Sequence, residues 1–432
     1  MSRFILKLFF WFLGFYSLYG QEQIITLDEC LELGRQHSLE MIVARLQTQV
    51  VEKEKQSVGS RFLPDVSLNG NQNYNFGSTI DPTTNSRISS NIQSNVFSLD
   101  AGVELLNVSG ILETQKQRLD LEVAKWIEEE LWLSYKLQLI EYYYEALDVQ
   151  NWLAIQKQQF LNSEANLKRI EKEVVSGARP QSDLYDIRVV YTNDARGILE
   201  TEHTLYTKKT QLFYWISQEE LAVENIALQS NEKSVVEEIA HTINPTLAKQ
   251  HKNIERLQKE RQLLKSINLP RLSANYSYGS FYSRPLQEQQ GSIASFDQQL
   301  RDNKSHFVGL RLSIPIFQGG AVIRGLQKNK VALAKAEQEL LREERLLRQE
   351  LTALEKALEQ GEVLRVSLYE SVDWAERSFT TNQVKYEHDK IDVFSFNQSK
   401  NQVLNTKYEL VKNELNQELL LLKMKLKVSI PL

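Results

Sequence analysis

The chain has 432 residues, of which 42% are hydrophobic and 25% are charged, and its formal net charge at pH 7 is −5. That length predicts two or three globular domains. However, the chain has only 8 prolines, and none lies between Leu112 and Arg179 or between Ile316 and Ile430. Proline-free stretches rich in Glu, Lys, Gln, Leu and Ala are typical of long helices. The slightly negative charge gives no indication of a nucleic-acid partner, which would favour a clustered basic face.

The first 20 residues have the pattern of a secretory signal peptide. Arg3 and Lys7 accompany an apolar run from Leu8 to Tyr19, and the small residue Gly20 precedes a polar segment. The alternative is a membrane anchor, which needs about 20 apolar residues, and this run is shorter. No later segment is apolar enough for a transmembrane helix, so any span of a membrane by the mature chain would have to be made by strands.

Two stretches of the chain share one order of predicted elements. Residues 38–75 can be aligned with residues 244–281, and in each stretch a helical segment ends at a proline, Pro64 or Pro270. Apolar and polar residues alternate after each proline and again in a returning segment. Because a period of two is the signature of a β-strand, each stretch predicts a pair of strands.

A long helix is predicted after each strand pair. Gly110 marks the end of the first pair, and Gly319 and Gly320 mark the end of the second. The apolar residues that follow are spaced by three and four positions, which favours coiled-coil packing. A helix from Gly110 to Ser176 would be about 100 Å long. Each long helix turns back through a short polar segment, residues 176–180 or 387–390, into a further helix.

The sequence therefore predicts four regions. They are a signal peptide (1–20), a first repeat (21–217), an inter-repeat equatorial segment (218–240) and a second repeat (241–432). The first repeat would hold a strand pair at about 65–107 and a helical hairpin at 110–217, and the second a strand pair at about 271–316 and a hairpin at 319–428. The inter-repeat segment lacks clear periodicity, and we expect it to pack around the middle of the helical part.

The predicted strands have one apolar face and no helical layer to cover it. In lipid, an open sheet leaves its edge amides and carbonyls unpaired, so the sheet must close. The smallest membrane barrels have about eight strands, so four strands require more than one copy, and two, three or four copies all remain open. Seven aromatic residues would fit an interfacial girdle: Tyr74, Phe76, Phe97, Tyr276, Tyr278, Phe281 and Tyr282. The alternative is a soluble sandwich with aromatic core residues.

Nearly the whole mature chain resembles the TolC-like outer membrane efflux proteins, or outer membrane factors. The resemblance rests on residues 25–33 (ITLDECLEL), on the two Leu-Pro pairs that precede strands, on residues 314–320 (IPIFQGG) and on the two helical turns. It implies a mixed α and β membrane protein with two internal repeats. Three copies would form a 12-stranded outer-membrane β-barrel, four strands from each, continuous with a long α-helical coiled-coil tube in the periplasm.

The same resemblance implies a function and partners. The homotrimer would lie in the outer membrane of a Gram-negative-type cell, in contact with its lipid. It would be the passive exit duct of a tripartite efflux or type I secretion system, opened at its helical tips by a periplasmic adaptor protein and an inner-membrane transporter. The sequence does not indicate which substrate is transported.

The two turns are the predicted docking sites for the adaptor. Family members commonly place glycine in both turns, followed by Ser or Asp and by Leu, and Gly177, Asp183 and Leu184 match this pattern. The second turn departs from it, with Asp389 where glycine is usual and Ser395 where an acid is common. Aspartate can adopt left-handed backbone geometry, so a tight turn is still expected. The docking prediction comprises Gly177, Ala178, Asp183, Leu184, Lys390 and Phe396.

The resemblance also predicts a gate at the tips that opens like an iris. Asp183 and Tyr386 match family positions that tie neighbouring hairpins together, and we expect Arg179 to add a further tie. Asp389 and Asp392 would form rings of carboxylates by three-fold repetition and favour cations. The alternative is that these charges are simply solvated in polar turns.

No enzyme, metal site or cofactor is predicted. The 6 histidines are scattered without metal-ligand spacing, and the glycines after residue 318 do not fit the dinucleotide-binding fingerprint. Cys30 is the only cysteine, and its amphipathic surroundings predict a small buried residue. The alternative to a channel is a periplasmic coiled-coil adaptor or scaffold protein without a pore, which the duplicated strand pair disfavours. A secreted hydrolase is a third alternative, with no catalytic constellation to support it.

Overall fold

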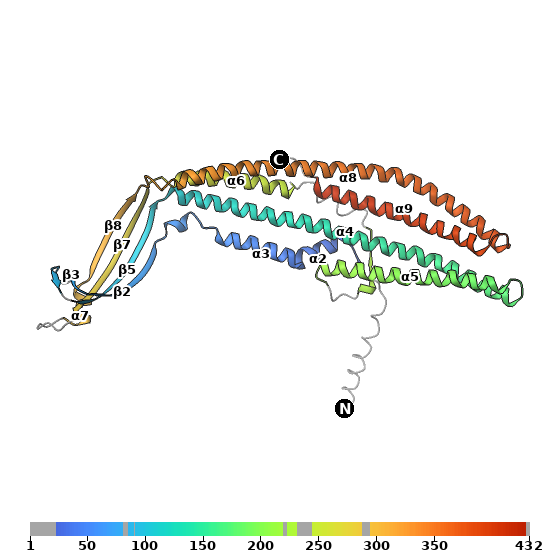
Figure 1. The fold of residues 1–432 in the computed structure, drawn as a ribbon, viewed down its shortest axis with the longest axis horizontal. Helices are drawn as coiled ribbons and strands as arrows, with labels where there is room; N and C mark the ends of the chain where they lie inside the picture. The colour runs from blue at the N-terminus through green and yellow to red at the C-terminus, as the bar shows by residue number, and fades with distance from the viewer. Residues whose placement is uncertain are drawn as a thin grey trace, which may run out of the picture. The chain divides into compact units, whose positions relative to one another are not determined.

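The computed structural model describes residues 23–80, 85–89, 91–218, 223–230, 244–286 and 294–428. The predicted signal peptide and most of the predicted inter-repeat segment lie outside these residues. The described chain is mostly helical with some antiparallel sheet, as the sequence predicted (Figure 1). It divides into two compact units. The sheet unit comprises Thr48–Ala124 and Gln250–Leu340, and the helical unit comprises Met1–Gln47, Lys125–Lys249 and Leu341–Leu432.

The sheet unit is built on four antiparallel strands in the order β2-β5-β7-β8. Their bounds are Asp65–Asn75 for β2, Ile92–Leu106 for β5, Arg271–Pro285 for β7 and Ser305–Ser313 for β8. Pro64 and Pro270 immediately precede β2 and β7, where a residue with a fixed φ and no N–H is tolerated. A small hairpin of β3 (Ser78–Ile80) and β4 (Arg87–Ser89) follows β2.

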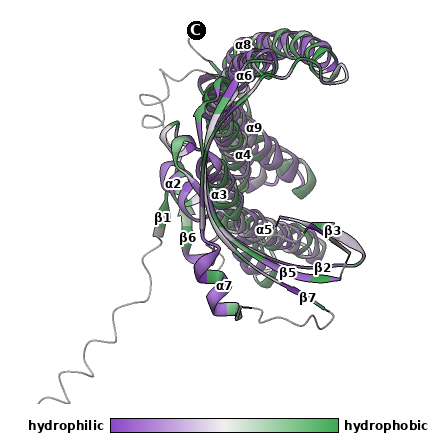
Figure 2. Cartoon of the chain, turned by 90° about the vertical axis from the view of Figure 1, so that its left-hand side faces the viewer, coloured by the Kyte–Doolittle hydropathy of each residue, from purple (hydrophilic) through white to green (hydrophobic). Residues whose placement is uncertain are grey.

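The register of the sheet separates an apolar face from a polar one. One row across the four strands consists of Val66, Ala101, Tyr276 and Val308. The next row is polar on three strands, with Ser67, Asp100 and Ser277, and ends in the exposed Phe307 on β8. The Asp100 carboxylate accepts hydrogen bonds from Ser98, Ser277 and Asn69 at 2.6, 2.5 and 2.8 Å. Hydrophobic and hydrophilic residues accordingly follow one another along the strands (Figure 2). The apolar face is open to solvent, with Val66 62% and Val308 78% exposed.

The C-terminal part of β7 is covered by a short helix that the sequence did not predict. Pairing with β8 ends at Gly279, six residues before the end of β7. Helix α7 (Phe296–Asp302) lies against the strand beyond this point. The Gln299 side chain is hydrogen-bonded to both the N–H and the carbonyl of Ser283, and the Asn303 amide donates to the Phe281 carbonyl at 2.9 Å. These two side chains supply the partners that a strand edge otherwise lacks.

Long helices make up the rest of the described chain. The bounds are α2 (Leu27–His37), α3 (Leu39–Glu54), α4 (Val108–Val175), α5 (Gln181–Trp215), α6 (Pro245–Ser266), α8 (Ala321–Glu387) and α9 (Val393–Lys427). Helices α4 and α8 have 68 and 67 residues, and α5 and α9 both have 35. In the helical unit, α5 runs beside α4 and α9 beside α8 (Figure 1). No helix of the described residues is long and apolar enough to cross a membrane.

The main core of the helical unit gathers apolar residues from α2, α4, α5 and α9. A two-stranded parallel sheet of β1 (Gln23–Ile25) and β6 (Ile226–Leu228) packs into this core. The Gln150 side chain is hydrogen-bonded to both the N–H and the carbonyl of Leu228. The Tyr143 hydroxyl lies 2.9 Å from the Ile25 carbonyl oxygen. Residues 223–230 belong to the predicted inter-repeat segment. These contacts hold them against α4.

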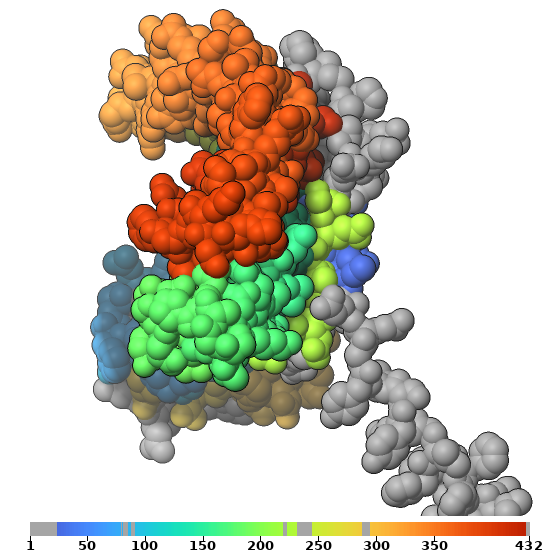
Figure 3. All heavy atoms as spheres, turned by 90° about the vertical axis from the view of Figure 1, so that its right-hand side faces the viewer, coloured from blue at the N-terminus to red at the C-terminus, as the bar shows by residue number. Residues whose placement is uncertain are grey.

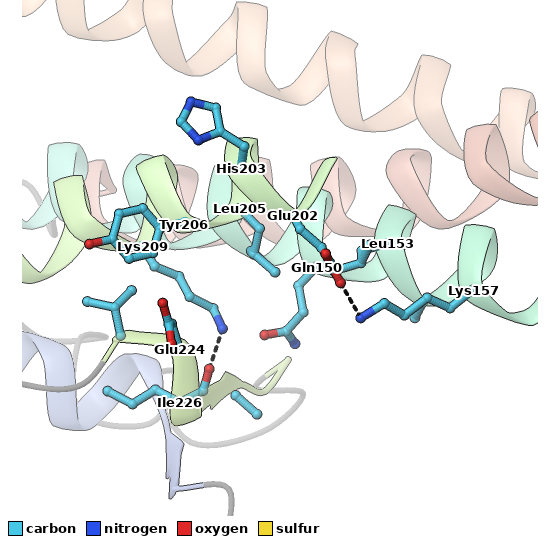
Figure 4. A pocket seen from close by; sticks show the side chains of 13 residues that line it. Gln150, Leu153, Lys157, Glu202, His203, Leu205, Tyr206, Lys209, Glu224 and Ile226 are labelled. Carbon is cyan, nitrogen blue, oxygen red and sulfur yellow. Dashed lines mark hydrogen bonds and ion pairs between the residues drawn. The ribbon is translucent and has the colours of Figure 1, made fainter. Parts of the chain in front are cut away.

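A pocket of about 680 Å³ lies between α4, α5 and the segment that contains β6 (Figure 4). Its wall includes an ion pair of 2.7 Å between Lys157 and Glu202. Lys209 is buried and donates a hydrogen bond to the Ile226 carbonyl. These contacts join α5 to β6 and help to hold the segment in place.

Candidate functional site at the helical tips

Two turns with the same backbone geometry join α4 to α5 and α8 to α9. The N–H groups of Gly177 and Ala178 donate to the carbonyls of Val174 and Glu173 at 3.0 and 2.8 Å. The N–H groups of Asp389 and Lys390 donate in the same way to Tyr386 and Lys385 at 3.2 and 2.8 Å. This pair of hydrogen bonds is the Schellman motif, which requires a left-handed residue after the helix.

The left-handed positions are Gly177, with φ of 76°, and Asp389, with φ of 55°. Glycine takes this conformation at no steric cost, and aspartate is one of the few other residues that visit it. The tight turn expected at Asp389 is therefore confirmed. Figure 3 shows the turn between α4 and α5, in green, beside the turn between α8 and α9, in orange and red.

Arg179 joins the two turns. Its side chain is only 7% exposed, and its Nε lies 2.7 Å from a Glu173 carboxylate oxygen. Its Nη1 lies 3.2 Å from Asp183, so these two ion pairs stay within the α4–α5 hairpin. Its Nη2 donates to the Tyr386 carbonyl at 3.1 Å and also pairs with the Asp389 carboxylate. One guanidinium group thus contacts both hairpins.

Tyr386 lies at the centre of a small core beneath the turns. It is 1% exposed, and its ring stacks on Phe396 with the centroids 4.6 Å apart. The guanidinium carbons of Arg169 and Arg179 lie 5.1 and 5.2 Å from its centroid, within the range of a cation–π interaction. Burial raises the pKa of the Tyr386 hydroxyl, and the two arginines oppose this shift. Within the described residues, the Tyr386 hydroxyl has no hydrogen-bond partner.

Asp392 has a local role at the start of α9. It is the N-cap residue, and its carboxylate accepts a hydrogen bond of 2.7 Å from the Ser395 N–H. This hydrogen bond holds the pKa of the Asp392 carboxyl below its usual value. The equivalent N-cap of α5 is Pro180, which offers no side-chain cap. The second tip therefore has a capped helix where the first has a rigid proline.

The structure brings four of the five predicted gate residues into direct contact, namely Arg179, Asp183, Tyr386 and Asp389. Asp392 lines the same pocket between the turns, which has a volume of about 470 Å³. Gly177, Ala178 and Lys390 of the predicted docking set are exposed. Leu184 and Phe396 are 7% and 3% exposed and pack inside the small core, so they support the turns from within.

Two further charged residues of the site, Arg169 and Glu173 in the last turns of α4, were not predicted from the sequence. They lie 3.4 Å apart as an i,i+4 ion pair, and that spacing was the available signal. The described residues contain no group of three or more His, Cys, Asp or Glu side chains placed to hold a metal ion. The site is therefore a charged, partly buried joint between two helical hairpins.

Comparison with known proteins identifies the fold. No protein-family model and no curated protein sequence matches the chain. The solved outer membrane protein VceC from Vibrio cholerae is 12% identical with a TM-score of 0.75, and the alignment covers 93% of this chain and 96% of that one. The outer-membrane channel OprN is 14% identical with a TM-score of 0.74, covering 93% and 89%. The Campylobacter jejuni outer membrane channel CmeC is 13% identical with a TM-score of 0.73, covering 93% and 85%.

These likenesses extend over almost the whole of each chain. At such low identity they establish the fold alone, which is that of outer membrane channel proteins. The predicted combination of long helices and an antiparallel sheet, as in outer membrane channels, is therefore confirmed for the single chain.

Proposed function

We propose that the chain is one protomer of an outer-membrane exit duct of the outer membrane factor type. Three copies would form a 12-stranded β-barrel, four strands from each, continuous with a helical tube in the periplasm of a Gram-negative-type cell. The observation that carries this proposal is the sheet, which has an exposed apolar face and, within the described residues, two unpaired edges. The shared fold with outer membrane channels supports it.

The sheet favours membrane insertion as a closed oligomer. Its apolar residues Leu68, Val308 and Leu310 are 79%, 78% and 72% exposed in the single chain. Within the described residues, β2 and β8 each have a strand partner on one side only. Unpaired backbone groups are very unfavourable in lipid. Pairing β8 of one copy with β2 of the next would satisfy both edges and turn the apolar faces toward lipid.

The two halves of the chain support the proposed internal repeats. Each half provides two strands of the sheet, then one helix of almost 70 residues and one of 35. The two turns also use the same hydrogen-bond pattern. Residues 21–217 and 241–432 would then be two copies of one unit, joined by the segment 218–240.

The helical tips would be the docking point of a periplasmic adaptor protein that works with an inner-membrane transporter. Exposed backbone and polar groups surround the pocket between the turns, including Ala178 and Lys390. In this arrangement the duct is passive, and the transporter selects the substrate. The system would be a tripartite efflux pump or a type I secretion system.

Arg179 would hold the tip closed. Its contacts to the Tyr386 carbonyl and to Asp389 join the α4–α5 hairpin to the α8–α9 hairpin, so moving the hairpins apart breaks both. Asp183 orients the guanidinium from its own hairpin at 3.2 Å. Three-fold repetition of Asp389 and Asp392 would place carboxylates around the opening and favour cations.

Planar-bilayer recording of the purified protein tests this function. The variant Arg179→Met, which removes the guanidinium contacts to the Tyr386 carbonyl and to Asp389, should raise the single-channel conductance above that of the unaltered chain. The matched control is Asp373→Ala, which removes an exposed ion pair with Arg377 on α8, 14 residues before the end of that helix, and should leave conductance unchanged. Equal conductance in Arg179→Met and the unaltered chain would rule out this gate, and the absence of any channel would rule out the duct.

A further inference from the structure

A largely buried charged cluster joins α9 to both α4 and α5 inside the helical unit. Lys400 of α9 is 3% exposed, and its Nζ lies 2.5 Å from a carboxylate oxygen of Asp194 on α5, whose side chain is 26% exposed. The same ammonium group donates to the Ser163 hydroxyl of α4 at 3.1 Å. Ser163 is 2% exposed and itself donates to Asp194 at 2.5 Å. Each of these three side chains contacts the other two.

This cluster of Lys400, Asp194 and Ser163, called the tie below, resists separation of α9 from α5. An ammonium group away from water must keep its partner, because removing one member of a buried ion pair leaves an uncompensated charge and is strongly destabilising. Surface ion pairs are screened by water and salt and contribute far less. Lys400 is the most buried lysine of the described chain. Pulling α9 away from α5 at this level therefore carries a larger penalty than at the exposed pairs.

The contacts between the hairpins differ on the two sides of this tie. Lys400 lies 8 residues from the N-cap Asp392, which is about 12 Å along the helix. Between the tie and the turns, Val393 and Phe396 of α9 pack with Tyr386 in the small core, whose apolar contacts are non-directional. The polar contacts of Arg179 there reach an Asp389 side chain that is 65% exposed. Beyond the tie, the Tyr408 hydroxyl donates to Asp148 at 3.0 Å, and the main core of the helical unit follows.

We propose that the Lys400–Asp194–Ser163 cluster is the fixed point about which the tip of the α8–α9 hairpin moves. The cluster stays intact while the contacts of Arg179 break and form, so movement is confined to the part of α9 between Lys400 and the turn. Lys400 is thus a positioning residue for the opening rather than a residue of the gate. This inference rests on the proposed function, since it assumes a tip that opens.

Spin-label distance measurements on the purified full-length protein test this proposal. A lower label pair at Tyr185 and Phe394 lies on the tip side of the tie, and an upper pair at Leu199 and Glu409 lies beyond it; all four side chains are exposed. The only native cysteine, Cys30, is completely buried, so introduced cysteines can be labelled selectively. Diluting labelled chains among unlabelled chains restricts the measured distances to single protomers.

The informative variant removes both the ion pair and its packing, Lys400→Ala together with Asp194→Ala. Removing both members leaves no uncompensated buried charge, so loss of the tie is separated from that penalty. The matched control is Lys423→Ala with Glu141→Ala, which removes another pair between α9 and α4, 2.6 Å apart and 21% and 38% exposed. Thermal unfolding of both variants verifies that they are folded.

The expected result is a broad distance distribution for the lower pair and a narrow one for the upper pair in the unaltered chain. In the Lys400→Ala, Asp194→Ala variant, the upper distribution should widen to match the lower one, while the control keeps it narrow. An upper distribution that stays narrow without the tie, or one already broad in the unaltered chain, would overturn the proposal. Bilayer conductance tests the gate separately, so failure of one idea is distinguishable from failure of the other.

Discussion

Replacing Arg179 by methionine should weaken the closed state of the tip. Methionine keeps a flexible side chain in the space beside Tyr386 but removes every hydrogen bond and ion pair of the guanidinium. The contacts to Glu173 and Asp183 lie within one hairpin and persist when the tip opens. The cation–π contact with the Tyr386 ring also joins the two hairpins, but the methionine sulfur makes a favourable contact with an aromatic ring in its place. Among the hydrogen bonds and ion pairs, only those to the Tyr386 carbonyl and to Asp389 join different hairpins, so the effect on opening comes mainly from these two.

The free energy that the contacts to the Tyr386 carbonyl and to Asp389 contribute to the closed tip follows from the surroundings of each contact. A hydrogen bond that involves a charged group contributes about 1.5–3 kcal/mol. The pair with Asp389, whose side chain is 65% exposed, adds about 0–1 kcal/mol. The sum of about 1.5–4 kcal/mol corresponds to a shift of roughly 10- to 700-fold toward the open tip, at 1.4 kcal/mol for each factor of ten.

Single-channel recording in planar bilayers measures this shift as the fraction of time spent in the high-conductance state. Arg179→Lys should give an intermediate result, because one ammonium group cannot reproduce the fork of the guanidinium. Glu173→Gln is the matched control, since it removes the 2.7 Å contact to the same arginine within one hairpin and should leave opening unchanged. If Arg179→Met behaves like Glu173→Gln, the reasoning from contacts between the hairpins is wrong.

Three further predictions concern single side chains. Tyr386→Phe removes a hydroxyl with no hydrogen-bond partner in the described chain. The free energy of unfolding, measured by urea titration, should therefore change by less than about 0.5 kcal/mol. A larger loss of stability would reveal a hydrogen-bond partner on another copy. Asp392→Ala should speed hydrogen exchange at the Ser395 amide and Asp392→Asn should not, because asparagine also caps. Since the pKa of Asp392 is lowered in the folded state, its contribution is full above the usual carboxyl pKa and is lost as pH falls through the lowered one, which the same exchange measured against pH would show. Cys30 is buried with a pKa raised to about 12, so a maleimide at pH 8 should label it only after unfolding; rapid labelling of the native protein would contradict the described core.

Periodicity and turn chemistry in the sequence predicted much of the fold. The alternation after Pro64 and Pro270 predicted strands, and the register of the sheet shows the corresponding apolar and polar rows. Helix α7 was missed because seven residues are too few for a periodic signal. Its stability comes from Gln299 and Asn303 bonding to the edge of β7, which is a tertiary interaction.

The tip was predicted in part. The positions of both turns followed from polar residues after long apolar stripes, and the left-handed conformation of Asp389 followed from its chemistry. The pairing of Arg179 with the Tyr386 carbonyl could not be predicted, because 207 residues separate them and the acceptor is a backbone atom. The Lys400–Asp194 pair was missed for a similar reason, since neither residue stands out among the many charges of α9 and α5.

The most direct test of the proposed function is the mass of the detergent-extracted mature protein by light scattering, after the two membranes have been separated. We expect a trimer recovered from the outer membrane, because three copies of the four-stranded sheet would supply the 12 strands of the proposed barrel. A water-soluble monomer or dimer in the periplasm would contradict it, since the exposed apolar face and the edges of β2 and β8 would then need another explanation.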